Sequence, residues 1–84
     1  MKLLNIGFGN LLNPARIVVM LNPDSSPVKR MIQEARDLGT AVDATRGRRT
    51  RSVIVTDSGH IILSAAQCET LSARLSGEKR TDKE

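Results

Sequence analysis

The spacing of apolar residues predicts one amphipathic helix near the middle of the chain, over residues 26–38. The apolar positions recur at intervals of three and four residues, which places them on one helical face. They are Val28, Met31, Ile32, Ala35 and Leu38. Ser26 and Pro27 suit the helix start as cap and first-turn residue, and Gly39 suits a left-handed cap at its end.

Shorter apolar runs on both sides of this helix predict strands. The runs cover residues 3–8, 17–21, 41–44, 52–56 and 60–63. The run at 17–21 is uninterrupted and begins with β-branched residues, which is typical of a buried strand. Asp57, Ser58 and Gly59 predict a tight turn that joins the last two strands as a hairpin. A second, shorter helix is expected over residues 68–75.

These elements predict an α+β domain with the order β-β-α-β-β-β-α. We expect a small, mostly antiparallel sheet of about five strands, covered on its apolar side by the long helix. This single domain covers residues 1–75. Residues 76–84 contain no apolar side chain, so we expect them to form a disordered, charged tail.

The composition favours a small cytoplasmic protein that gains stability from assembly. With 84 residues and one aromatic side chain, Phe8, the chain can build only a small core, so we expect a subunit interface to add stability. One cysteine and one histidine are too few for a disulfide framework or a zinc site. We see no export signal and no apolar run long enough to cross a membrane.

The positive charge is concentrated in residues 46–51, Arg-Gly-Arg-Arg-Thr-Arg, which we call the arginine loop. Residues 1–75 carry ten Lys and Arg against six Asp and Glu; without the loop's four arginines, the two signs balance at six each. One guanidinium group can donate two parallel hydrogen bonds to the oxygens of a phosphate. The loop therefore predicts a polyanion-binding surface. The alternative is a solvated turn whose arginines pair with acids elsewhere in the fold.

Arg16 is a second candidate, because no other charged residue lies between Lys2 and Asp24. It would extend the cationic surface if the first loop and the arginine loop share one end of the sheet. Otherwise Arg16 is a rim residue, or its stem lies over the core. Asp43 precedes the arginine loop and is expected to orient one of its arginines.

Nothing in the sequence indicates a catalytic centre. Neither His60 nor Cys68 belongs to a recognisable catalytic motif, so both are interpreted as structural residues. Residues 7–9, Gly-Phe-Gly, predict a strand-ending turn rather than a dinucleotide site, with glycines that allow close backbone approach. On the helix, Arg30 and Glu34 are spaced for an ion pair on a solvated face.

Two segments, together with the distance between them in the sequence, resemble the family of extracellular matrix regulatory protein A, RemA. They are residues 5–10, Asn-Ile-Gly-Phe-Gly-Asn, and residues 47–51, Gly-Arg-Arg-Thr-Arg. Shorter similar segments lie at residues 26–30, 35–37, 43–45 and 62–65, so the resemblance runs from about Leu4 to Leu75. It implies a cytoplasmic bacterial DNA-binding protein that activates transcription of biofilm matrix genes. It also implies subunits that assemble into closed rings, with DNA along a positive outer surface.

Carried over by position, the resemblance places the DNA contacts at Arg16, Arg48 and Arg49, with Arg51 close by. Arg46 stands where the family has an aromatic residue, which adds charge to the surface. Cys68 stands where the family has a proline at the start of the last helix. These departures leave the target genes and the ring size open.

The residues and the resemblance together predict a nucleoid-associated transcriptional regulator that binds double-stranded DNA as a ring-shaped homo-oligomer. The predicted DNA-binding residues are Arg16, Arg46, Arg48, Arg49 and Arg51. We expect selection of DNA by shape, since no helix resembles a major-groove reading helix. We expect no enzymatic activity, cofactor, metal, small-molecule ligand or membrane contact.

Two alternatives remain open. The first is an RNA-binding or ribosome-associated protein, which would stack bases on aromatic side chains. Phe8 is expected in a core strand, which disfavours this function. The second is an adaptor whose arginines bind an acidic protein partner. Target promoters, subunit number and protein partners are not predicted.

Overall fold

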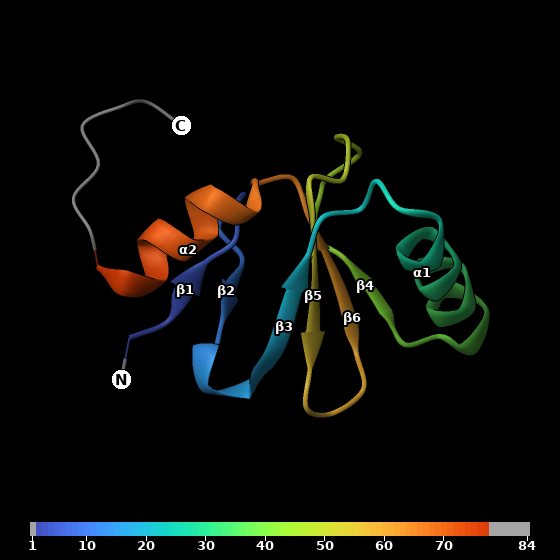
Figure 1. The fold of residues 1–84 in the computed structure, drawn as a ribbon. Helices are drawn as coiled ribbons and strands as arrows, with labels where there is room; N and C mark the ends of the chain where they lie inside the picture. The colour runs from blue at the N-terminus through green and yellow to red at the C-terminus, as the bar shows by residue number, and fades with distance from the viewer. Residues whose placement is uncertain (1, 78–84) are drawn as a thin grey trace.

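A four-stranded sheet separates two apolar layers in the computed structural model, which describes residues 2–77 (Figure 1). The sheet contains β3 (Ile17–Leu21), β5 (Ser52–Thr56), β6 (Ile61–Ser64) and β4 (Ala41–Asp43), in that order. Helix α1 (Ser26–Leu38) covers one face. The other face is covered by β1 (Leu4–Asn5), β2 (Leu11–Leu12) and α2 (Cys68–Ser76).

The predicted α+β class is confirmed, but the strands form two sheets rather than one. β1 and β2 pair with each other and stand apart from the four-stranded sheet. The larger sheet is mostly antiparallel, as predicted, because β3 and β6 both run antiparallel to β5. Its single parallel pair joins β4 to β6.

The alternation of side chains along β5 divides the core into two clusters, because neighbouring strand residues point to opposite faces. Ile54 packs toward β1 and α2, whereas Val53 packs toward α1, and both are fully buried. The first cluster contains Leu4, Ile6, Ala44, Ile54, Ile62 and Leu71. The second contains Ala35, Val53, Ile61 and Leu63.

Helix α1 has the predicted bounds, with a cap one residue earlier than predicted. Ser25, and not Ser26, is the N-cap, and its Oγ accepts a hydrogen bond from the Val28 amide at 3.4 Å. Gly39 closes the helix in the left-handed conformation, as expected, with φ of 79°. The predicted ion pair between Arg30 and Glu34 is not formed between these two described residues. A bond from Gln33 Nε2 to Asp37 Oδ1 lies on this face instead.

The predicted first strand over residues 3–8 is wrong in its second half. The chain turns at residues 7–9 and returns as β2, a segment expected to be loop. Phe8 therefore sits in the turn, 45% exposed and with φ of 55°, instead of in a core strand. Gly7 and Gly9 also have positive φ, yet no atom of the described chain beyond the adjoining residues lies within 4 Å of where their Cβ would be. They serve the turn's conformation and not a close approach within this chain.

The strand over residues 17–21 forms as predicted but is not buried. β3 lies at the edge of the sheet, and its pairing with β5 shifts register between Ile17 and Val19. Val18 is 65% exposed and Val19 is 38% exposed. The outer side of β3 therefore combines apolar side chains with an unpaired strand edge, which is a surface suited to another chain.

The C-terminal elements follow the prediction closely. The strand expected over 60–63 begins one residue later as β6, and α2 covers the residues expected to be helical. α2 ends at Gly77, which has a left-handed backbone. The tail predicted for residues 76–84 lies, from residue 78 onward, outside the described residues. Within residues 2–77, neither helix is long and apolar enough to cross a membrane.

Candidate nucleic-acid interface

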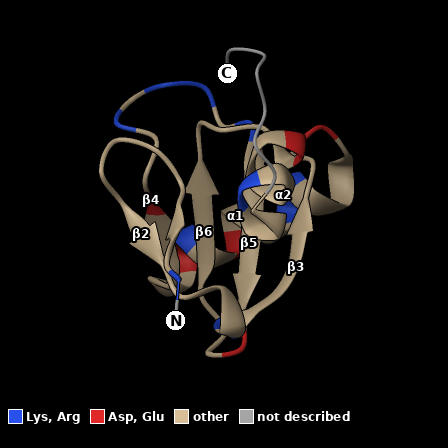
Figure 2. Ribbon diagram, turned by 90° about the vertical axis from the view of Figure 1, so that its left-hand side faces the viewer, with Lys and Arg blue, Asp and Glu red and all other residues tan. Residues whose placement is uncertain are grey.

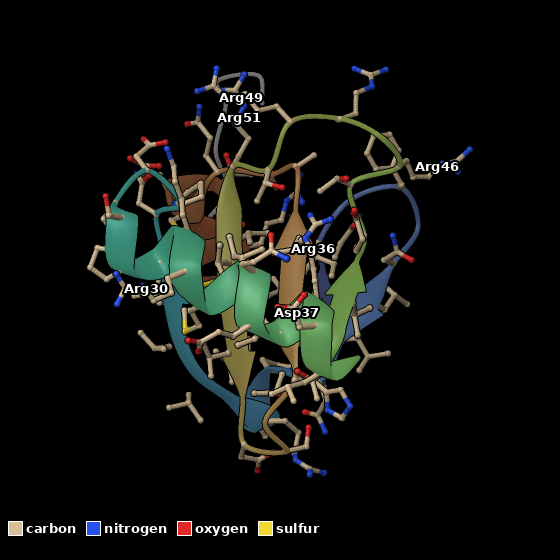
Figure 3. All side chains as sticks on the ribbon, turned by 90° about the vertical axis from the view of Figure 1, so that its right-hand side faces the viewer. Arg30, Arg36, Asp37, Arg46, Arg49 and Arg51 are labelled. Carbon is tan, nitrogen blue, oxygen red and sulfur yellow. The ribbon has the colours of Figure 1, made fainter. Side chains whose placement is uncertain are left out.

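The arginine loop joins β4 to β5 and projects beyond the end of the four-stranded sheet (Figures 1 and 2). All four of its arginines are exposed. Figure 3 shows Arg46, Arg49 and Arg51 at this end of the molecule, with side chains directed away from the sheet. Among residues 2–77, none of the four pairs with an Asp or Glu within 4.0 Å. Within the described residues, no acid elsewhere in the fold therefore neutralises the loop.

Backbone contacts hold both ends of the loop in place. At its start, the Arg48 amide donates to the Thr45 carbonyl at 3.0 Å, and Thr45 itself is buried. At its end, the Arg51 amide donates to the Ser64 carbonyl at 2.8 Å. The guanidinium groups are thus displayed from a fixed base.

Asp43 organises the start of the loop through Thr45. Its Oδ1 accepts bonds from the Thr45 amide at 2.9 Å and the Thr45 hydroxyl at 2.6 Å. These two bonds hold the pKa of the Asp43 carboxyl below its usual range, and the charge of Arg36 on α1 lowers it further. The expectation that Asp43 orients an arginine of the loop is wrong, because its hydrogen bonds go to Thr45.

The turn that carries Phe8 meets the arginine loop. The Cζ atoms of Arg46 and Arg48 lie 5.6 Å and 5.9 Å from the centroid of the Phe8 ring. Both distances fall within the reach of a cation–π interaction. Phe8 and the arginine loop, distant in sequence, therefore lie side by side at the surface.

A hollow lies between these two segments. It has a volume of about 390 Å³ and is lined by Phe8, Arg48, Arg49, Arg51 and Ala65. Among the described residues, no acidic side chain lines it, and its three charged lining residues are all positive. A second hollow of about 190 Å³ lies behind the loop, next to the start of α2. There Asp24 and Glu69 face Arg49 and Arg51, so the charges are mixed.

Arg16 lies at the opposite end of the sheet from the arginine loop. Ile17 pairs with Thr56 at the far end of β5, whereas the loop leads into Ser52 at the near end. Arg16 Nε donates to Asp57 Oδ1 at 2.7 Å and Oδ2 at 3.0 Å. The condition under which Arg16 would extend the cationic surface is therefore not met within one chain.

His60 and Cys68 lie outside the arginine loop, His60 in the β5–β6 turn and Cys68 at the start of α2. His60 Nδ1 lies 2.7 Å from Ser58 Oγ inside the β5–β6 turn. Cys68 is the first residue of α2, and burial raises the pKa of its thiol, with a smaller contribution from the charge of Glu69. A raised thiol pKa opposes nucleophilic reactivity.

Sequence reasoning missed Phe8 as part of the site. Because Phe8 is hydrophobic and follows an apolar run, the sequence pattern predicts that it lies in a strand. The flanking Gly7 and Gly9 instead indicate a left-handed turn. A large apolar side chain in such a turn has no layer of the fold to pack into. That combination was the available signal that Phe8 would be exposed.

The fold and the arginine loop together describe a small α+β protein with an exposed cationic surface. Comparison with known proteins shows a match over residues 3–75 to the RemA-like family, described as extracellular matrix regulatory protein A-like. The chain belongs to this family, which confirms the resemblance seen in the sequence.

Close relatives occur in several bacteria. A protein of Moorella thermoacetica is 62% identical over 78 residues, covering 93% of this chain and 86% of the relative. One of Heliobacterium modesticaldum is 60% identical with the same coverage. One of Acetivibrio thermocellus is 58% identical over 84 residues, covering 100% and 90%. Each bears the name "Putative regulatory protein".

Proposed function

We propose that this protein is a non-enzymatic transcriptional regulator that binds double-stranded DNA through the arginine loop, in the cytoplasm at the nucleoid. One observation carries the proposal: four exposed arginines lie on one projecting loop without an acidic partner among residues 2–77. Membership of the RemA-like family and the names of the relatives support a regulatory role. The biofilm matrix genes are the targets that the family resemblance suggests.

We further propose that the protein acts as a ring-shaped homo-oligomer. Both edge strands of the four-stranded sheet expose apolar residues, Val18 and Val19 on β3 and Val42 on β4. Leu38, at the end of the helix that precedes β4, is 78% exposed. Packing the β3 edge of one copy against the β4 edge of the next would cover both surfaces. Because the two edges differ, such a contact is head-to-tail, and head-to-tail contacts close into rings when the rotation allows.

Assembly also gives Arg16 a place in DNA binding. Within one copy it lies at the far end of the sheet from the arginine loop. In a ring, a duplex on the outer surface passes several copies, so it can meet the arginine loop of one and Arg16 of another. A ring repeats the same weak binding site in every copy. Linked sites raise the avidity for DNA by roughly 10²–10⁴ without new contacts.

The test is a binding titration with fluorescent duplex DNA across a range of salt concentrations. Changing Arg48 and Arg49 to Ala together should abolish binding while leaving the mass of the assembly unchanged. Arg30→Ala, an exposed arginine on α1, is the matched control. The logarithm of the binding constant should fall by about 0.9 per neutralised phosphate for each unit of log salt. Normal duplex binding by the double variant would end the proposal.

The RNA-binding alternative gains support from one observation. The sequence disfavours RNA binding by placing Phe8 in the core, whereas Phe8 is exposed beside the arginine loop. Single-stranded RNA in competition with the duplex separates the two functions. The adaptor alternative predicts binding to acidic protein partners that survives nuclease treatment.

A further inference from the structure

The Gly-Phe-Gly turn is built to hold an aromatic ring at the surface. Phe8 adopts a left-handed backbone between two glycines that do the same. Gly7 anchors the turn, since its carbonyl accepts bonds from the Asn10 amide and from Asn10 Nδ2, both at 3.0 Å. The Gly7 amide donates to Asn5 Oδ1 at 2.8 Å. A bulky apolar residue in a left-handed turn, without a core to enter, points to a binding role for its side chain.

The surroundings of the ring define what it can bind. Phe8 lines the hollow of about 390 Å³ together with three arginines, Arg48, Arg49 and Arg51. A flat apolar ring therefore lies beside three cationic side chains. This combination fits a planar group that is attached to negative charge. A nucleobase with its phosphates is such a group, because bases stack on aromatic rings and on guanidinium planes.

We propose that Phe8 stacks against an unpaired nucleobase while Arg48, Arg49 and Arg51 bind the adjacent phosphates. The inference rests on the proposed nucleic-acid function and extends it from the backbone to a base. A base inside an intact duplex has both faces covered by its neighbours. The contact is therefore made where a nucleotide has left the stack, at a bulge, a strand end or a single strand.

The arginines that now contact the ring do not close this site. Arg46 and Arg48 lie near the outer limit of a cation–π contact, on long side chains. Arg46 does not line the hollow, whereas Arg48 does. An incoming base can stack on the ring face while the guanidinium of Arg48 turns to its phosphate.

The experiment compares three DNA duplexes of one sequence: fully paired, with one unpaired thymine, and with an abasic residue in place of that thymine. The abasic duplex keeps the extra phosphate and the flexibility but lacks the base. The protein should bind the unpaired-thymine duplex about 5- to 150-fold more tightly than the abasic one, which is the range of aromatic–base stacking. Equal affinity for these two probes would overturn the inference. Thymidine and uridine single strands as competitors then show whether DNA or RNA supplies the base.

Two variants of Phe8 test the ring itself. Phe8→Leu keeps an apolar side chain and should remove the preference for the thymine, because leucine has no ring on which a base can stack. Phe8→Trp should retain the preference, because the indole ring stacks at least as well. If Phe8→Leu weakens binding to all three duplexes equally, the ring only positions Arg46 and Arg48, and the stacking proposal is wrong.

The tryptophan variant also reports contact directly, since the natural chain contains no tryptophan. Its fluorescence should be quenched more by the unpaired thymine than by the abasic site, and equal quenching would contradict stacking. The outcomes separate this inference from the proposed function. Duplex binding without thymine preference defeats the inference alone. Phe8-dependent binding of single strands without duplex binding defeats the duplex function alone.

Discussion

Arg16 and Asp57 form an ion pair across the end of the sheet that faces away from the arginine loop. The Arg16 Nε atom lies 2.7 Å from Asp57 Oδ1, and the two side chains are 57% and 49% exposed. An ion pair this exposed is screened by solvent and adds little to stability. Its main consequence is electrostatic, because Asp57 offsets the positive charge of Arg16 where a phosphate would approach.

Asp57→Asn should therefore strengthen duplex binding while barely changing the melting temperature. Removing the carboxylate charge leaves Arg16 positive and without a competing anion. The gain should be largest at low salt, since exposed charges are screened as the salt concentration rises. Arg16→Ala should weaken binding in the same titration. If both variants bind as the natural protein does, Arg16 is not a DNA contact.

Asp43→Ala should lower thermal stability at neutral pH, and the difference should shrink in acid. The Asp43 carboxyl has a pKa below its unfolded value, so it stabilises the folded state in its charged form. This stabilisation is present above the unfolded pKa of about 3.9 and is lost as the pH falls through the lower folded value. Melting curves at a series of pH values check the sign. Asp24→Ala, at an exposed carboxylate away from Thr45, is the control. A difference that stays constant from neutral to acidic pH would contradict this account.

Ser25→Ala should destabilise the protein by about 1 kcal/mol, because α1 loses its N-cap acceptor. Ser26→Ala is the matched control, since Ser26 is already the first helical residue and does not cap. Urea unfolding of both variants gives the two free energies of unfolding. Equal effects at the two positions would show that the cap is not at Ser25.

Introducing charge at either edge of the four-stranded sheet should break the proposed ring. Val18→Lys and Val42→Lys each place a lysine on one edge strand, and each should yield a monomer by light scattering. Leu11→Lys is the control, because Leu11 is 59% exposed on β2, outside the larger sheet. A ring that survives both edge changes would exclude these surfaces as the contact.

Mixing the two edge variants tests the direction of the contact. In a head-to-tail arrangement, the intact β3 edge of Val42→Lys can still pair with the intact β4 edge of Val18→Lys. The mixture should therefore contain dimers and no larger species. If Val42→Lys alone forms dimers, the contact instead joins two β3 edges about a twofold axis.

The elements set by local patterns were predictable, and those set by topology were not. Helix α1 follows from apolar spacing and end signals that lie within the helix itself. The exposure of β3 depends on which strands lie beside it. An apolar edge strand has the same sequence pattern as a buried strand, so the sequence does not distinguish them. The place of Arg16 depends on the pairing of Ile17 with Thr56, a contact between residues far apart in the chain.

The candidate site shows the same division. The arginine loop was predictable because charge density is visible in the sequence itself. The contact of Phe8 with Arg46 and Arg48 was not, because the Gly-Phe-Gly turn and the arginine loop meet only in the folded chain. The role of Asp43 as an acceptor for Thr45 likewise required the geometry of the loop start.

The arginine loop connects an outer strand to an inner one, since β4 lies at an edge, β5 lies inside the sheet, and β6 stands between them. A ligand that restrains the loop therefore also restrains β4, the strand that we propose faces the next copy. In the proposed ring, ligand binding to the loop and the strength of the contacts between copies would then be thermodynamically coupled, and such coupling is reciprocal. Nucleic acid would tighten the oligomer by the same factor by which oligomerisation tightens the hold on nucleic acid.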